Sequence, residues 1–156
     1  MKSTKVLVNT ALMYAVAAMA GGVFYREFTK FNMFEGRTAL GFVHTHLFLL
    51  GMLFFLVAAV LDKQFALTER RGFKEFFMLY NTGLVVMTIG LVWRGVAQVK
   101  AMELSIGIDA AISGVSGLGH IFLALGLIGF FVLLKRQLAG VPIKSVDRKK
   151  HFINKK

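Results

Sequence analysis

An all-α integral membrane bundle of four helices is the fold that this sequence predicts, and three observations predict it. The chain has 156 residues, is 56% hydrophobic and has a mean hydropathy of +0.67, whereas about 45–50% of a soluble domain is apolar. Four apolar stretches are each long enough to cross a bilayer, for which a helix needs about 20 residues. Of the 19 basic residues, all but Arg94 lie in the segments outside these stretches.

The four predicted spans follow one another with short connections and so form a single up-down bundle. They cover residues 6–25, 39–61, 76–99 and 110–134. Helices are expected because lipid offers no hydrogen-bond partner to backbone groups. Residues 1–134 are therefore one transmembrane domain, and residues 135–156 are a basic tail. The first span also has features of a secretory signal, but its length and its place in the repeat described below favour a membrane helix.

The distribution of basic residues predicts how the bundle is oriented. Fourteen of the 19 lie in the N-terminus, the second loop and the tail, which share one side, and five lie on the other side. Basic loops stay in the cytoplasm, so we expect a multi-pass protein of the bacterial cell membrane with both termini cytoplasmic. The net charge of +11 is then a topology signal near anionic lipid, and no nucleic-acid partner is expected.

Several chemistries are excluded by what the chain lacks. It has no cysteine, which excludes disulfides, thiolate metal sites and covalently attached haem. It also has no serine-nucleophile arrangement, phosphate loop or pair of carboxylates. We therefore expect no self-contained enzyme.

A short pattern suggests that the chain contains two related hairpins. Residues 19–26 and 87–94 both read M-x-x-G-x-x-[YW]-R, and a G-x-x-H follows each of them, at 41–44 and 117–120. An internal repeat of this kind fixes architecture, and two parallel hairpins would be related by a pseudo-twofold axis along the membrane normal. Chance is the alternative, because the match is short and its residues are common in membrane helices.

Three histidines lie inside the predicted spans, where ionisable side chains are costly and mark function. They are His44 and His46 in the second span and His120 in the fourth. These two spans run in the same direction, so their histidines are expected at similar depth in the outer half of the bundle. Two facing imidazoles without a third ligand suit haem iron better than a tetrahedral metal. We therefore predict haem b with His44 and His120 as axial ligands.

His44 is preferred to His46 because of its neighbours and its place in the repeat. The two side chains point about 200° apart around a helix, so only one of them can face the haem. Gly41 and Gly51 flank His44, and Gly117 precedes the fourth-span histidine. Such small residues would let a flat macrocycle approach the backbone, although helix packing also explains them. His46 stays open as a hydrogen-bonding residue, a second-site ligand or a proton relay.

Arginines near the outer side are candidate partners for the haem propionates. Arg26 and Arg94 close the two repeat motifs, and Arg37 precedes the second span. Arginine pairs with carboxylates by bidentate hydrogen bonds. The alternative is interfacial anchoring beside Tyr25 and Trp93, which suit an aromatic belt.

The stretch from Arg37 to Gly51, with its His44-Thr45-His46 core, resembles the second helix of subunit I in haem-copper oxidases and nitric-oxide reductases. That resemblance implies that His44 ligates a low-spin haem b. The chain has no counterpart of the copper-site histidines, which speaks against oxygen reduction. Over its full length the chain is similar to a family of small bacterial four-helix membrane proteins, domain-of-unknown-function family 2871, which implies the architecture and no activity.

These observations leave three hypotheses about function. The first is a b-type haem protein for electron transfer or for haem sensing or handling, with a quinone or a redox protein as its partner. The second is a protein that binds or transports copper or zinc through His44, His46 and His120. The third is a structural partner subunit whose histidines only join helices. Assembly as a homo-oligomer is compatible with all three.

Overall fold

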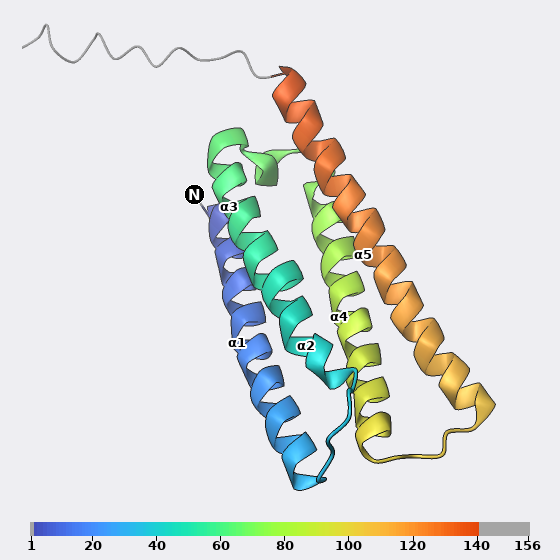
Figure 1. The fold of residues 1–156 in the computed structure, drawn as a ribbon. Helices are drawn as coiled ribbons and strands as arrows, with labels where there is room; N and C mark the ends of the chain where they lie inside the picture. Colours follow the sequence, from blue (N-terminus) through green and yellow to red (C-terminus); the bar gives the residue numbers. More distant parts are fainter. Residues whose placement is uncertain (1, 141–156) are drawn as a thin grey trace, which may run out of the picture.

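The structure, a computed structural model, describes residues 2–140, with side chains described from residue 4. Four helices in this part of the chain are long and apolar enough to cross a membrane, which confirms the predicted all-α bundle. Figure 1 shows their arrangement. In chain order the elements are α1 (Lys2–Phe31), α2 (Leu40–His46), the π-helical segment η1 (Leu47–Leu53), α3 (Phe54–Phe65), the 3₁₀ turn η2 (Leu67–Glu69), α4 (Phe73–Val99) and α5 (Ile106–Gly140). The second span is therefore one continuous helical rod made of α2, η1 and α3.

The helices extend beyond the predicted spans at most of their ends. The first continues to Phe31 instead of residue 25, and α5 runs from Ile106 to Gly140 instead of from 110 to 134. Hydropathy marks only the part of a helix that matches the hydrocarbon, whereas charged helix formers such as Lys135 and Arg136 continue the helix beyond it. The predicted tail thus begins as helix, and its residues 141–156 lie outside the described part of the chain.

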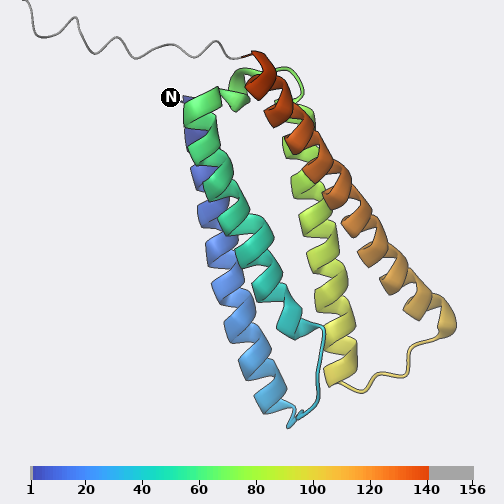
Figure 2. The same cartoon turned by 45° about the horizontal axis from the view of Figure 1, so that its top comes forward.

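The helices form two antiparallel hairpins that lie side by side in chain order. In both ribbon views α1 runs along the α2–α3 rod, and α5 runs along α4 (Figures 1 and 2). We call the end of the bundle with the start of α1 and the end of α5 the basic end, and the other the distal end. Both views show α5 tilted away from α2 toward the distal end.

Aromatic packing at the basic half explains why α5 meets the second rod only there. The Phe54 ring stacks on Tyr80 of α4 with a centroid distance of 4.2 Å, and it contacts Phe130 of α5 at 5.1 Å. Phe76 completes the group at 5.1 Å from Phe130. Aromatic pairs contribute about 0.5–1.5 kcal/mol each beyond area burial, so three helices are fastened together at this level.

Small residues set the spacing between α4 and α5. A Cβ on Gly83 would lie 2.8 Å from the Cα of Leu123, and one on Gly126 would lie 2.8 Å from the Cα of Tyr80. Gly119 meets the backbone of Met87 in the same way. The two helix axes approach closely because these positions carry no side chain, as is common where membrane helices pack.

Polar contacts fix the second rod against α4 and give η1 a partner. At its distal start, Thr38 Oγ1 donates to the Gly95 carbonyl at 3.0 Å, and the Ala39 N–H donates to Gln98 Oε1 at 2.7 Å. Within η1, the carbonyl of Leu50 accepts a 2.9 Å bond from the Tyr80 hydroxyl. The π-helical segment widens the rod just after His44 and His46. Such π-helical turns are frequent at functional sites.

Candidate functional site

His120 lies on α5 with its ring exposed and its hydrogen bonding fixed. Its Nδ1 is 2.7 Å from the carbonyl of Ser116. A carbonyl only accepts hydrogen bonds, so Nδ1 is the donor in this contact, and in a neutral imidazole the lone pair is then on Nε2. This arrangement, with one ring nitrogen donating to a backbone carbonyl, is the one that orients a histidine for metal ligation through the other nitrogen.

An apolar groove of about 480 Å³ runs between the second rod and α5, and His120 lies at its edge. We call it the rod–α5 groove. Its walls are almost entirely apolar, and its volume is in the range of small-molecule and cofactor sites. The lining residues other than His120 are Leu49, Leu50, Leu53, Phe54, Val57, Tyr80, Leu123, Ala124 and Leu127.

His46 repeats the local arrangement of His120. Its Nδ1 is 2.7 Å from the carbonyl of Phe42, four residues earlier, so its Nε2 is also the free nitrogen. His46 precedes Leu50 by four residues and therefore lies on the same helix face. Because Leu50 lines the rod–α5 groove, this face of the rod is the one turned toward His120.

His44 packs in a different direction, against α1. Its ring stacks on Tyr25 with a centroid distance of 6.3 Å and an interplanar angle of 15°, and a Cβ on Gly22 would lie 3.7 Å from its side chain. Its Nδ1 is buried, and among the described residues it is the one buried side-chain nitrogen or oxygen atom without a hydrogen-bond partner. Such an unmet bond costs about 1–3 kcal/mol. Of the predicted axial pair, only His120 lines the groove.

Relative to the two sequence motifs, the predicted ligands differ in position by about one helical turn. His44 lies opposite Gly22 of the first repeat motif, and the equivalent Gly90 lies opposite Ser116. His120 is four residues beyond Ser116, which is about 6 Å along the helix. The two hairpins therefore pack in different registers, although their sequence motifs match.

The glycines near the histidines have distinct surroundings. Gly51 packs on Tyr14, since a Cβ there would lie 2.6 Å from the Tyr14 Cβ, and Gly41 lies 3.6 Å by the same measure from the Tyr25 ring. Both are helix-packing positions. Gly117 has nothing within 4 Å, so it leaves open space on α5 one turn from His120.

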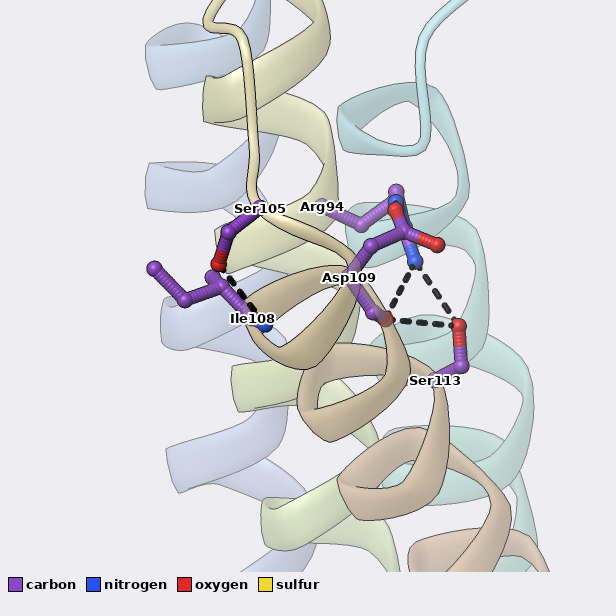
Figure 3. A network of polar contacts seen from close by, with 5 residues as sticks. All are labelled: Arg94, Ser105, Ile108, Asp109 and Ser113. Carbon is purple, nitrogen blue, oxygen red and sulfur yellow. Dashed lines mark hydrogen bonds and ion pairs between the residues drawn. The ribbon is translucent and has the colours of Figure 1, made fainter.

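Arg94 is engaged in a polar cluster at the distal end, which Figure 3 shows. Its guanidinium forms an ion pair with Asp109 and donates to the Asp109 carbonyl at 3.1 Å and to Ser113 Oγ at 2.8 Å. Arg94, a predicted partner for a haem propionate, therefore already has a carboxylate partner in Asp109 of α5. The α5 N-terminus is capped by Ser105, whose Oγ accepts from the Ile108 N–H at 3.4 Å.

The other two predicted arginines are exposed. The Arg26 side chain is 79% exposed and has the adjacent Glu27 at 3.7 Å. Arg37 lies in the exposed loop before α2. Both face solvent at the distal end, where they are accessible to an anionic group.

Sequence reasoning missed the fixed tautomers of His46 and His120 and the widened turn between His46 and α3. The four-residue spacing from His46 to Leu50 indicates that both side chains share a helix face. It points to a site only once the groove that Leu50 lines is known. Among residues 4–140 no group of three or more His, Cys, Asp or Glu side chains is arranged to hold a metal ion. His44, His46 and His120 therefore do not form such a group in this part of the chain.

Comparison with known proteins identifies one family. A family model described as protein of unknown function (DUF2871) matches residues 4–137. No curated protein and no solved structure matches the chain. The likeness of residues 37–51 to haem-copper oxidases is therefore not shown by these comparisons.

Proposed function

The chain belongs to the DUF2871 family, whose description assigns no function, and we propose from its own residues that it is a membrane b-type haem protein for electron transfer. In this proposal haem b would lie in the rod–α5 groove, held by His120 and a histidine of the second rod. The observation that carries the proposal is the shared geometry of His46 and His120, whose Nδ1 protons are both held by carbonyls.

The geometry favours His46 as the second ligand, whereas the sequence favours His44. His46 lies on the helix face of Leu50, which lines the groove, whereas His44 packs against Tyr25 of α1 with its Nδ1 buried. Groove walls of leucine, phenylalanine and tyrosine would exclude water from the macrocycle. The open space at Gly117 supports a close approach to α5.

The chain's residues would perform three tasks around such a group. The carbonyls of Phe42 and Ser116 would hold the imidazole tautomers, the apolar walls would set a low dielectric, and Arg26 and Arg37 would supply exposed guanidinium groups at the distal end. When bound, haem held by two histidines would supply one-electron transfer. A quinone or a redox protein would be the partner, and the basic end would face the bacterial cytoplasm.

The test is a visible spectrum of the full chain purified from haem-sufficient cells. We expect a Soret band with sharp α and β bands on reduction. The bands should be lost in His46→Ala and in His120→Ala and retained in His44→Ala, which serves as the matched control on the same helix.

A colourless protein that also fails to take up added haemin would overturn the proposal. Loss of the bands in His44→Ala with retention in His46→Ala would keep the haem and return the ligand to the position that the sequence favours. Size-exclusion profiles of all three variants control for unfolding.

A further inference from the structure

A second groove lies at the basic end between α4 and α5, away from the histidines. Its lining combines charged and apolar residues, as a binding site for an amphiphilic molecule does. It has a volume of about 230 Å³. Its rim is charged and its wall is apolar. The rim includes Arg71, Glu75 and Arg136, and the wall includes Leu79, Leu125 and Gly129.

The two arginines are at the same level of the bundle. Tyr80 lies opposite Gly126, and the antiparallel helices place Arg71, nine residues before Tyr80, level with Arg136, ten residues after Gly126. Both are exposed, and neither lies within ion-pair distance of a carboxylate among the described residues. Both guanidinium groups are therefore available to an external anion.

The start of α4 adds a second feature that favours an anion. Gly72 lines the same groove and is the N-cap of α4, with no side-chain cap. An uncapped helix N-terminus offers free N–H groups and a positive dipole end to a phosphate.

The wall shows that a free anion would not fill the groove. From Arg136 to Leu125 the wall extends about 16 Å along α5, and Leu125 and Val132 are exposed on the surface of a membrane span. A hydrocarbon chain fits this wall and a phosphate fits the rim. Basic pockets between membrane helices on the cytoplasmic side bind lipid head groups in this way.

We propose that the groove formed by Arg71, Gly72, Arg136 and the wall at Gly129 is a binding site for one anionic phospholipid. The phosphate lies between the two guanidinium groups at the start of α4, and an acyl chain lies along Leu79, Leu125 and Gly129. Glu75 at the rim opposes the phosphate, so the site has a net charge of one positive unit.

The experiment titrates the full chain in detergent with phosphatidylglycerol or with phosphatidylcholine of the same acyl chains, followed by native mass spectrometry. We expect Arg71→Gln/Arg136→Gln to weaken phosphatidylglycerol binding by roughly 30-fold, about fivefold for each basic residue. Glu75→Gln should strengthen it by a few fold. Lys30→Gln/Lys100→Gln, which removes the same charge from exposed positions at the distal end, should leave it unchanged.

A second variant tests the wall. A Cβ on Gly129 would meet Phe76 Cβ at an ordinary 3.8 Å, so Gly129→Leu fills the groove without a clash at its first atom and should weaken binding of both lipids. Gly114→Leu on the same helix, where nothing lies within 4 Å, is its control.

Two results would overturn the proposal. One is unchanged phosphatidylglycerol affinity in the double arginine variant with an intact elution profile. The other is equal competition by glycerol phosphate, which has no acyl chains and would mean that the wall takes no part. Neither result depends on haem.

Discussion

At the scale of single residues, the glycines divide by what an added methyl group would meet. Gly83 faces the backbone of Leu123 on α5, with a Cβ 2.8 Å from its Cα. Backbone cannot rotate away as a side chain can. Gly114 of α5 faces open space. The same substitution at the two sites should therefore have opposite effects on stability.

We expect Gly83→Ala to lower the free energy of unfolding by about 1–3 kcal/mol, because overpacking moves the two helices apart. Gly114→Ala should raise it by about 0.5–1 kcal/mol, since alanine loses less conformational entropy in a helix. Thermal unfolding of both variants in the same detergent measures the difference. Equal shifts would show that the α4–α5 contact is looser than described.

The histidines show how far residue type alone reaches. That His44, His46 and His120 lie within spans could be predicted from hydropathy. The choice between His44 and His46 could not, because it depends on which helix covers each face of the second rod. The Nδ1 contacts with Phe42 and Ser116 are local to one helical turn each. Whether they orient the histidines toward a ligand depends on the groove, which is formed by segments far apart in the sequence.

At the scale of elements, α5 is held differently at its two ends. Near the basic end, Phe130 packs into the aromatic group with Phe54 and Phe76. Near the distal end, the main polar tie is Arg94, whose guanidinium bonds to Asp109 and Ser113 (Figure 3). The distal half of α5 should therefore depend on this cluster more than the basic half does.

We expect Arg94→Gln to speed amide exchange in residues 106–113 by about fivefold, which corresponds to about 1 kcal/mol for a partly exposed ion pair. Exchange around Phe130 should not change. Arg26→Gln, which removes an exposed arginine beside Glu27, is the control and should leave both regions unaffected. Equal exchange in the Arg94 variant and the wild type would mean that packing on α4 alone holds the start of α5.

At the scale of the whole molecule, the charge at the two ends predicts the orientation in the membrane. The chain has no cysteine, so single cysteines report without background. Glu35→Cys and Glu103→Cys lie in exposed positions at the distal end, and Arg70→Cys lies in an exposed position at the basic end.

In intact cells a membrane-impermeant maleimide should label Glu35→Cys and Glu103→Cys and should spare Arg70→Cys, because basic segments remain cytoplasmic. All three should react after lysis, which controls for accessibility. Labelling of Arg70→Cys alone in intact cells would reverse the orientation and place the phospholipid groove in the other leaflet.

The sequence by itself determined the helix number, the approximate spans and the basic end, since length, hydropathy and charge act locally against the bilayer. Only the tertiary structure decided which faces meet. The motifs around Gly22 and Gly90 match in sequence, yet His44 packs on α1 while His120, about one helical turn further along relative to its motif, lies at the rod–α5 groove. The physical reason is that the register between paired helices depends on close backbone contacts, such as that of Gly83 with Leu123. Hydropathy cannot tell which of many apolar residues make such contacts.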